Sequence, residues 1–319
     1  MPPPILLLTG WLLDRILGEP RRAHPLMGFG RAATALEARL NRPRLTTARR
    51  RLHGALAVVL LVAPVTVAVW AALRGAAQIV PHGDLLGAVI LYLCLGGYSL
   101  RQHAEAVATP LAGGDLATAR RAAGCLVSRD TETMNPDEVA AAATESVLEN
   151  GHDAVFATLF WFLVAGAPGA VAHRLVNTLD AQWGYRTPRY RHFGWAAARL
   201  DDLLGYLPAR LAAASYALVS GRPGPALRAT VHNGRKWPGI NPGVVMAAGA
   251  GGLGLRLGGP ASYAGSTRHR PHLNPEGAPA DAGAIRRAAA LVERTALLWL
   301  VASVLCWTAS LAMNGPWIQ

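Results

Sequence analysis

The chain has 319 residues, of which 52% are hydrophobic and 16% are charged. Soluble domains carry about 25% charged residues, so this composition excludes a disordered chain and disfavours an ordinary soluble enzyme. The formal net charge is +12, and all 31 basic residues except Lys236 are arginines. Such a charge fits nucleic acid, anionic lipid or an anionic substrate. The positions of the arginines along the chain distinguish these partners.

The apolar segments predict membrane helices. The first, Ile5–Leu13, is too short to span a bilayer, because a span needs roughly 20 apolar residues. It lacks a basic region before it and a small-residue cleavage site after it, so we expect an interfacial or partly inserted helix and not a cleaved signal peptide. Three longer uncharged segments predict spans, and they cover residues 55–73, 85–100 and 296–313.

Two further apolar segments are ambiguous. Residues 154–172 are uncharged but are interrupted by Gly166-Ala-Pro-Gly169, and residues 239–255 are rich in glycine. Each fits a span, and each equally fits a broken, re-entrant or protein-buried segment, where irregular backbone is tolerated at membrane depth. Residues 256–294 are polar and predict a loop with one short helix from about Ala280.

The arginines predict which side of the membrane each loop occupies. Ten lie between Arg15 and Arg51, beside the first long apolar segment. Cytoplasmic loops carry such an excess, whereas a nucleic-acid arm would carry interleaved aromatic residues, so we expect a bilayer partner and no nucleic acid. Residues 14–53, 101–153 and 173–210 are then cytoplasmic. Residues 154–172 must in that case enter and leave on the same face.

Together these features predict an all-α, polytopic integral membrane protein with about five membrane segments, some of them broken or re-entrant, and cytoplasmic helical loops. We expect residues 1–319 to form a single membrane-embedded domain, with the polar catalytic region at about 129–210.

A helix with a carboxylate edge is predicted in the first polar region. Asn135 is suited to cap the helix and Pro136 to begin it, and Asn150-Gly151 is a good stop. At about 100° per residue, Glu138, Glu145 and Glu149 share one edge, which Asp153 would extend. Like charges four residues apart destabilise a helix unless they are neutralised. The edge therefore indicates either a solvated acidic face with arginine partners or a site for Mg²⁺ or a Mg-nucleotide.

The second polar region, residues 173–210, interleaves six arginines with Asn, Thr and Tyr residues. Guanidinium groups bind oxyanions bidentately, so this pattern fits phosphate or carboxylate recognition. It equally fits a positively charged cytoplasmic loop with aromatic anchors. Asp201 and Asp202 lie between Arg199 and Arg210, and they fit either simple ion pairs or a second carboxylate site.

Several common signatures are missing from the sequence. It contains no Walker loop, no HExxH and no CxxC, and its three cysteines are too scattered for a disulfide framework. Gly249–Gly254 matches GxGxxG, but no βαβ unit surrounds it, so we interpret these glycines as sites of close helix packing. His24 and His232 are isolated, and we expect neither to bind a metal.

The run from Arg129 to Arg210 resembles the adenosylcobinamide-phosphate synthase family of cobalamin biosynthesis, also called CobD/CbiB. The resemblance is carried by RDTETMNPDEVAAAATESVLENGHD, the segment from FW to GAPGA, NTLDAQWGYRTPRYRHFGWAAARLDD and LPARL. LLDRILGEPRRAHPLMGFGR and GGLGLRLGGPASYAG are similar to the family as well. The sequence departs from the family pattern at residues 232–238, where extra basic residues precede an Asn-Pro-Gly core.

The resemblance implies a multi-pass enzyme of the cell (inner) membrane whose active site faces the cytoplasm. It implies ATP- and Mg²⁺-dependent amide formation between adenosylcobyric acid, a corrinoid, and (R)-1-amino-2-propanol or its O-phosphate, giving adenosylcobinamide or its phosphate. Association with other late enzymes of the pathway is a further expectation.

Within this resemblance we expect an acyl-phosphate intermediate, because the carboxylate needs activation before an amine can attack. Arginines would hold phosphates, and Asp201 or Asp202 would deprotonate or hold the incoming ammonium. The expected catalytic residues are Asp130, Glu145, Glu149, Asp201 and Asp202. The expected metal ligands are Glu145, Glu149 and Asp153. The expected substrate-binding residues are Arg129, Asn150, Arg174, Asn177, Thr178, Asp180, Arg189, Tyr190 and Arg210.

Two other classes stay open. One is a non-catalytic membrane scaffold or sensor similar to AmpE-type proteins, and the other is a corrinoid-binding transporter. Transport favours polar groups inside spans and repeated halves. Here the long apolar segments are free of charge and the ionisable groups cluster in loops, which favours the enzyme.

Overall fold

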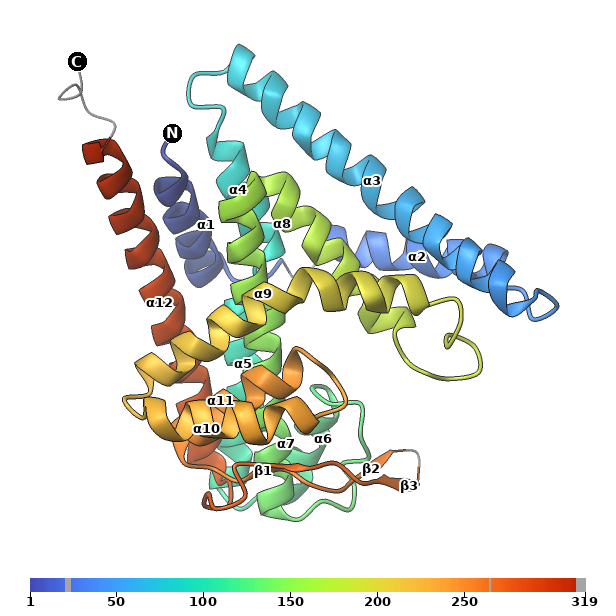
Figure 1. Cartoon of the computed structure of the whole chain (residues 1–319), viewed down its shortest axis with the longest axis vertical. Helices are drawn as coiled ribbons and strands as arrows, with labels where there is room; N and C mark the ends of the chain where they lie inside the picture. Colours follow the sequence, from blue (N-terminus) through green and yellow to red (C-terminus); the bar gives the residue numbers. More distant parts are fainter. Residues whose placement is uncertain (21–23, 264, 314–319) are drawn as a thin grey trace. The chain divides into compact units, whose positions relative to one another are not determined.

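The computed structural model describes residues 1–20, 24–263 and 265–313, and most of them are helical (Figure 1). The chain forms two compact units. Unit 1 combines Met1–Gly96 with Ala157–Gly205, and unit 2 combines Gly97–Phe156 with Tyr206–Gln319. The all-α fold class is confirmed, whereas the single domain over residues 1–319 stays a prediction.

Unit 1 is a bundle of helices around an aromatic core. Its helices are α1 (Pro3–Leu17), α2 (Pro25–Leu40), α3 (Thr47–Ile79), α4 (Leu85–Cys94), α8 (Ala157–Trp183) and the first part of α9 (Trp195–Val219). Within the core, Trp183 and Phe193 pack edge to face with ring centroids 5.0 Å apart. Glycines permit close approach here, because a Cβ on Gly54 would collide with the Phe193 carbonyl group.

Unit 2 combines helices with short strands. Its helices are α5 (Gly97–Ala112), α6 (Leu116–Gly124), α7 (Pro136–Gly151), the rest of α9, α10 (Pro223–His232), α11 (Pro242–Leu253) and α12 (Ala282–Met313), with a π-helix at His152–Phe156 and a 3₁₀ turn at Gly234–Lys236. The strands are β1 (Leu257–Gly258), β2 (Ala261–Tyr263), β3 (Ser266–Arg268) and β4 (His272–Leu273). They form two antiparallel pairs, β1 with β4 and β2 with β3.

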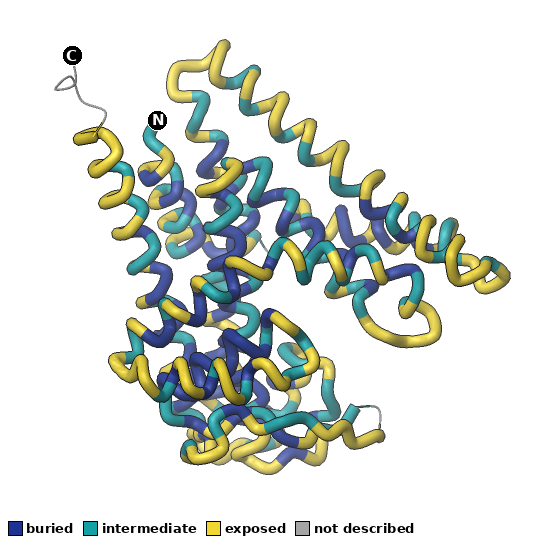
Figure 2. The backbone as a smooth tube through the Cα atoms, in the orientation of Figure 1, coloured by how far each residue is buried: buried dark blue, intermediate teal, exposed yellow. Residues whose placement is uncertain are grey.

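Among the described residues, four helical segments are long and apolar enough to cross a membrane: Thr47–Ile79, Leu85–Ala112, Pro136–Trp183 and Ala282–Met313. Much of the surface of α3 and α12 is exposed (Figure 2) and apolar, with Val67 60% and Leu305 62% exposed. Exposed apolar surface of this extent fits lipid contact. The three predicted spans are confirmed as parts of these longer helices.

The structure resolves both ambiguous segments. Residues 154–172 belong to a long helical segment that bends at Ala165 and Gly166, where Gly166 has a φ of 66°. The predicted break therefore lies in the Gly-Ala-Pro-Gly run. Residues 239–255 contain α11, which has 12 residues and is buried along most of its length. It is a protein-buried helix and not a candidate span, and the four candidate spanning segments of the described chain agree with the expected number of about five.

The predicted stop at Asn150-Gly151 is confirmed for the α-helix, because α7 ends at Gly151, although the chain continues through the π-helix into α8. One other local prediction is wrong. Residues 256–294 are not a loop with one short helix. They hold the four strands, and their helix continues through the third predicted span to form α12.

The glycine-rich run confirms the packing interpretation. Gly249 and Gly251 lie in α11, where a Cβ on Gly249 would collide with Leu148 and a Cβ on Gly251 with the backbone of α10. These glycines let helices of unit 2 pack closely, and no βαβ unit surrounds them in the described chain.

Candidate active site

The carboxylate edge is built on α7, whose start is fixed by a capping box. The Asn135 side chain accepts a hydrogen bond from the Glu138 N–H, and the Glu138 carboxylate accepts one from the Asn135 N–H. The predicted cap at Asn135 is confirmed. Glu138 thereby satisfies the helix N-terminus, which leaves Glu145 and Glu149 as the carboxylates further along the helix.

Glu145 is buried and lies between two arginines. Its Oε2 accepts hydrogen bonds from Arg129 Nη2 at 2.6 Å and from Arg270 Nη1 at 3.5 Å. Its Oε1 accepts one from the Gly258 N–H at 2.8 Å. A buried carboxylate needs such partners to remain ionised. Because both oxygens are occupied, Glu145 is better suited to hold the arginines than to bind a metal ion.

Arg129 keeps its charge in this environment. Burial alone would lower the pKa of its guanidinium, but the adjacent Glu145 carboxylate outweighs burial, so the pKa of Arg129 lies above its ordinary value. The ion pair with Glu145 also fixes the orientation of the Arg129 guanidinium. The structure thus presents a fixed positive group beside α7.

Arg270 is the second cation of the site. It follows β3, lies over the Trp237 ring at 4.8 Å and donates from Nε to the Gly259 carbonyl at 3.1 Å. Its side chain is 9% exposed, and its Nη2 atom is buried without a hydrogen-bond partner in the described chain. A buried, unsatisfied guanidinium nitrogen is rare. It is a donor that an anionic ligand would satisfy.

Asp130 secures the strands beside this site. Its Oδ2 accepts hydrogen bonds from the Ser262 hydroxyl at 2.8 Å and the Gly265 N–H at 2.9 Å, and its own N–H donates to the Ser262 carbonyl at 3.0 Å. These contacts anchor the β2–β3 pair to the residue next to Arg129. The geometry supports a positioning role for Asp130.

Glu149 and Asp153 continue the edge. The Glu149 side chain makes no hydrogen bond or ion pair in the described chain, and it interacts electrostatically with Asp153, Glu145, Arg129 and Arg270. Asp153 accepts a hydrogen bond from His152 Nδ1 at 2.6 Å, at the start of the π-helix. A π-helix within an α-helix frequently marks a functional site.

The carboxylates along this edge of α7 suit Mg²⁺ only in part. Among the described residues, no group of three or more His, Cys, Asp or Glu side chains is arranged to hold a metal ion. Mg²⁺ in phosphate-transfer sites needs one or two carboxylates, with the substrate phosphates and water completing its shell. Glu149 and Asp153 fit that requirement, whereas Glu145 is engaged by the arginines.

Two other expected site residues lie in unit 2, Asn150 and Arg210. Both make hydrogen bonds to nearby helical segments. Asn150 donates from Nδ2 to the Ser146 carbonyl and hydroxyl, both at 2.9 Å. Arg210 donates to Asn241 Oδ1 at 2.6 Å and to the Ile240 carbonyl at 3.1 Å. Arg210 therefore ties α9 to the segment that leads into α11, and neither side chain touches Glu145.

In unit 1, several of the expected site residues form a separate network of hydrogen-bonded side chains. Arg174 donates to Asn177 Oδ1 at 3.2 Å, and Asn177 donates to Asp201 Oδ1 at 3.3 Å. Thr178 donates back to the Arg174 carbonyl within α8, and Asp180 lies one turn from the end of that helix. The structure thus links Arg174, Asn177 and Asp201, which sequence reasoning had grouped.

Arg189 has a structural partner that the sequence did not reveal. It donates to both oxygens of Glu37, from Nε at 3.0 Å and from Nη2 at 2.5 Å. Glu37 is 2% exposed and lies on α2. Tyr190 stacks under the same guanidinium, with the cation 5.4 Å from the ring centroid. Arg189 is therefore committed to a carboxylate of its own unit.

Asp202 pairs with Arg199 at 3.6 Å, as one of the two interpretations of the Asp201-Asp202 pair allows. Burial raises the pKa of Asp202, and the positive charges of Arg199 and Arg186 only partly oppose this. A carboxyl group with a raised pKa is a better proton acceptor than an ordinary aspartate.

Sequence reasoning missed Arg270, Gly258 and Glu37. Arg270 lies 125 positions from Glu145, in a polar stretch without periodicity. The only local signal is its position in the run Arg268-His-Arg270. Glu37 was not predicted as a buried partner, because a single acidic residue in an arginine-rich segment is usually exposed to solvent.

Comparison with known proteins identifies the family. The CobD/Cbib protein family matches residues 7–292. This chain belongs to that family. The Cobalamin biosynthesis protein CobD of Chromobacterium violaceum is 52% identical over 298 residues, covering 92% of this chain and 93% of that protein. The protein of the same name from Stutzerimonas stutzeri is 52% identical over 293 residues, covering 91% and 93%.

A more distant CobD, from Geobacter metallireducens, is 40% identical over 309 residues and covers 94% of this chain and 96% of that protein. No solved structure matches the chain. The match runs through both units, so this CobD/CbiB chain has a role in cobalamin biosynthesis. The resemblance seen in the sequence is confirmed.

Proposed function

We propose that the protein is an ATP-dependent C–N ligase that joins adenosylcobyric acid to (R)-1-amino-2-propanol or its O-phosphate. The observation that carries the proposal is the buried Glu145 between Arg129 and Arg270, with a donor of Arg270 left without a partner. Two fixed guanidinium groups beside a carboxylate edge suit a reaction in which anions meet and negative charge must be neutralised.

The proposed amide formation takes place in two steps. In the first, the propionate carboxylate of the corrinoid attacks the γ-phosphorus of ATP, which forms an acyl phosphate and releases ADP. In the second, the amine attacks the acyl carbon, the C–N bond forms, phosphate leaves and the amine proton passes to a base. Arg129 and Arg270 would bind phosphoryl oxygens throughout, while Glu145 keeps both guanidinium groups in place.

Mg²⁺ would be held by Glu149 and Asp153 and would neutralise charge on the phosphates when bound. The general-base role of Asp201 or Asp202 in unit 1 is a separate proposal. It is supported by the raised pKa of Asp202, and Asp202→Asn tests it through the pH profile of kcat.

We also propose that the protein lies in the inner membrane with its active site facing the cytoplasm. The four apolar helical segments support a membrane location. The arginine-rich loops support the orientation, because cytoplasmic loops carry such an excess.

Turnover in nanodiscs tests the reaction directly. Protein would be incubated with adenosylcobyric acid, ATP, Mg²⁺ and each amine in turn, and the products followed by mass spectrometry. We expect a product heavier than the corrinoid by the amine minus water, with ATP consumed. No product with either amine, from protein that still binds the corrinoid, would overturn the ligase and favour a scaffold or transporter.

Glu149→Gln tests the carboxylate in the same assay. We expect kcat/KM to fall by about 100-fold at saturating Mg²⁺. Glu132→Gln is the matched control, because Glu132 is an exposed carboxylate outside α7. Unchanged activity of Glu149→Gln would remove Glu149 from the metal and catalytic assignments.

A further inference from the structure

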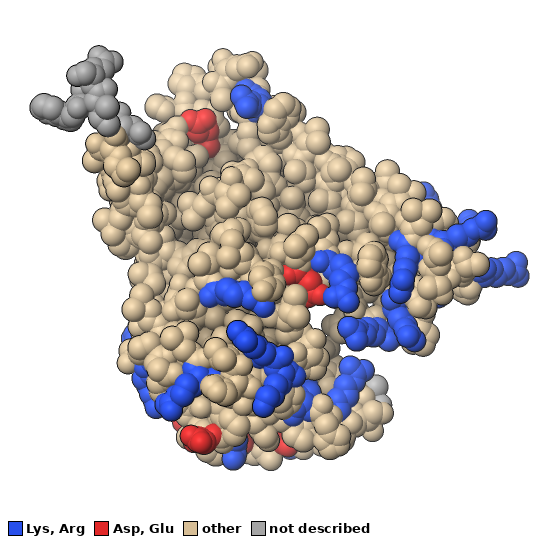
Figure 3. All heavy atoms as spheres, viewed as in Figure 1, with Lys and Arg blue, Asp and Glu red and all other residues tan. Residues whose placement is uncertain are grey.

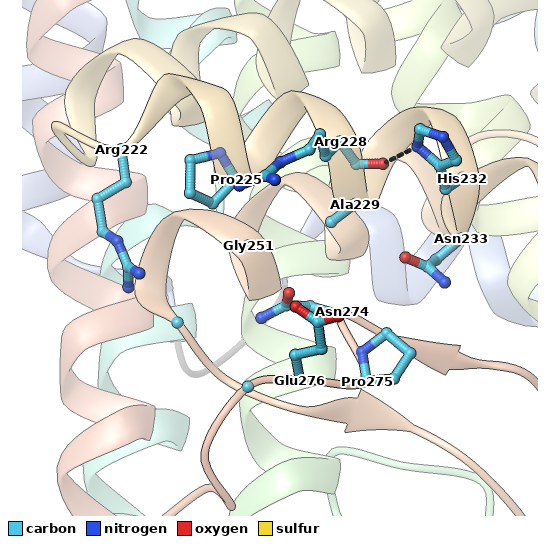
Figure 4. Close-up of a pocket in the computed structure, with 12 residues that line it drawn as sticks. Arg222, Pro225, Arg228, Ala229, His232, Asn233, Gly251, Asn274, Pro275 and Glu276 are labelled. Carbon is cyan, nitrogen blue, oxygen red and sulfur yellow. Dashed lines mark hydrogen bonds between the residues drawn. The ribbon is translucent and has the colours of Figure 1, made fainter.

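The segment between α10 and α11 departs from the family pattern at residues 232–238, and the proposed reaction gives it no role. It begins at the end of α10, where Asn233 lines a hollow between α10 and the end of α11 (Figure 4). Basic side chains are widespread over this region of the molecular surface (Figure 3), and the extra basic residues of the segment, Arg235 and Lys236, are exposed. Exposed charges are screened by water and contribute little to a fixed geometry. Trp237, which follows them, is half-buried and packs against a buried arginine.

The position of Trp237 is fixed from two sides. Its N–H donates to the Gly234 carbonyl at 3.2 Å, which closes the 3₁₀ turn before it. Gly243, near the start of α11, packs so closely on this turn that a Cβ would collide with the Trp237 side chain and the Gly234 carbonyl. The turn and α11 therefore hold the base of the indole side chain in place.

The indole ring lies against both partners of the Arg270–Glu145 ion pair. The Arg270 guanidinium carbon is 4.8 Å from the ring centroid. On the other side, a Cβ on Gly258 would come within 3.1 Å of Trp237 Cζ3. The Gly258 N–H donates to Glu145 Oε1 at 2.8 Å. One ring thus packs on the arginine and on the backbone that binds the carboxylate.

The hydrogen bonds of Arg270 do not by themselves fix the plane of its guanidinium group. Its Nε donates to the Gly259 carbonyl at 3.1 Å, but the Nη1 bonds to Glu145 Oε2 and the Tyr263 hydroxyl are long, at 3.5 and 3.4 Å. Long hydrogen bonds constrain direction weakly. A flat aromatic ring under the cation restricts rotation of the plane, and the attraction is stronger where water is excluded. The Arg270 side chain is 9% exposed, so the Trp237 contact is of this stronger kind.

We propose that Trp237 is a positioning residue whose ring keeps the Arg270 guanidinium in the orientation that reserves Nη2 for an anionic ligand. Nη2 is the buried donor that has no partner in the described chain. The inference rests on the proposed function in one respect, because it takes that ligand to be a phosphoryl group. Trp237 acts through Arg270 and does not itself bind the ligand. Residues 232–238 then contribute to the site through an aromatic ring and not through their basic side chains.

Two substitutions separate the aromatic face of Trp237 from its bulk. Trp237→Phe keeps a ring under Arg270, whereas Trp237→Leu fills part of the same space without one. Pyrophosphate is titrated into the full-length protein in maltoside detergent and phosphate-free buffer and followed by ³¹P NMR. We expect Trp237→Leu to weaken binding by about tenfold and Trp237→Phe by less than about threefold, because a desolvated cation–π contact contributes roughly one factor of ten. Equal weakening by the two variants, or no binding to the wild type, would overturn the proposal.

A double-mutant cycle tests whether Trp237 acts through Arg270. In the Arg270→Gln background, Trp237→Leu and Trp237→Phe should bind pyrophosphate equally, because the group that the ring positions is gone. Arg129 remains as the other cation of the site, so the weaker binding is measured at higher pyrophosphate concentration. A tenfold difference that persists in this background would show a direct or merely structural effect of the ring and overturn the positioning role.

Arg235→Gln is the matched control, because Arg235 is an exposed cation two residues from Trp237. It should change the affinity for pyrophosphate by less than about twofold. Weakening as large as that of Trp237→Leu would show nonspecific charge attraction and overturn the proposal.

The binding readout separates this inference from the ligase. Protein that forms no amide product but shows the expected difference between Trp237→Leu and Trp237→Phe would overturn the ligase and retain the positioning role. Protein that forms the amide while both variants bind pyrophosphate equally would retain the ligase and overturn the role of Trp237.

Discussion

Arg129 and Glu145 form a buried ion pair with 2.6 Å between Nη2 and Oε2, and their side chains are only 11% and 2% exposed. The pair joins the segment that precedes α7 to the inner face of that helix. Glu145 also accepts from the backbone of β1. One carboxylate therefore holds together the segment before α7, α7 itself and the strand region, which is more than 100 residues away in sequence.

Glu145→Gln should destabilise unit 2. The substitution leaves two arginines beside a neutral amide, and breaking a buried pair costs about 3–5 kcal/mol. We expect a clear drop in the thermal unfolding temperature in detergent. Glu132→Gln should leave that temperature unchanged, because Glu132 is exposed. Equal unfolding temperatures for Glu145→Gln and the wild type would show that the network contributes little to stability.

Arg270 should matter for turnover more than its neighbour Arg268 does. Arg270→Gln removes the buried donor that lacks a partner, and loss of one such electrostatic contact reduces kcat by about 100-fold or more. Arg270→Lys should not restore activity, because an ammonium group lacks the planar fork.

Arg268→Gln is the control for Arg270, since Arg268 is exposed and stacks on Tyr263 with 4.8 Å between the cation and the ring centroid. Steady-state kinetics of the three variants give the comparison. Similar kcat/KM values for Arg270→Gln and Arg268→Gln would remove Arg270 from the reacting centre.

The sequence predicted those parts of the fold that have a local cause. The cap at Asn135 follows from side-chain chemistry within one helical turn, and the bend at Gly166 follows from a glycine two residues before a proline. The apolar segments predicted membrane helices because their hydrophobicity is continuous. Each of these signals is contained in fewer than about 20 residues.

The strands and the partners of the carboxylates could not be predicted in that way. Strands of two or three residues carry no periodic pattern, and residues 256–281 therefore looked like a loop. Arg270 reaches Glu145 only through the tertiary fold. The same holds for Glu37 and Arg189, whose 152-residue separation gives no local signal.

The Glu37–Arg189 pair predicts a pH dependence of stability. Burial alone would raise the pKa of Glu37, but hydrogen bonds from Arg189 and Asn41 outweigh burial, so the pKa lies below its ordinary value of 4.5. A carboxyl group with a lowered folded-state pKa stabilises the fold above the unfolded-state pKa. That contribution is lost as the pH falls below 4.5 and through the folded-state value.

Thermal unfolding of the wild type and of Glu37→Gln at several pH values measures this effect. At pH 7 the wild type should unfold at the higher temperature. The two unfolding temperatures should converge as the pH falls below about 4.5, because protonated glutamate and glutamine are then both neutral. The gain is modest, since Arg189 is 60% exposed and solvent screens the pair. A difference that stays constant down to pH 3 would show that the ionisation of Glu37 does not contribute.

Two glycines of α3 should respond in opposite ways to the same substitution. A Cβ on Gly54 would collide with the carbonyl group of Phe193, whereas a Cβ on Gly75 would meet no atom within 4 Å. Gly54→Ala therefore forces α3 away from the aromatic core of unit 1, which costs about 1–3 kcal/mol in a packed interior. Gly75→Ala should instead stabilise the helix by about 0.5–1 kcal/mol, because alanine restricts the unfolded chain more than glycine does.

Unfolding temperatures in one detergent compare the two variants directly. Both substitutions add the same methyl group to the same helix, so differences in helix propensity cancel and the contact at Phe193 remains. Equal shifts for Gly54→Ala and Gly75→Ala would mean that α3 does not approach Phe193 so closely. A lower unfolding temperature for Gly54→Ala alone would confirm that a glycine at this position allows the N-terminal part of α3 to pack against the Trp183–Phe193 pair.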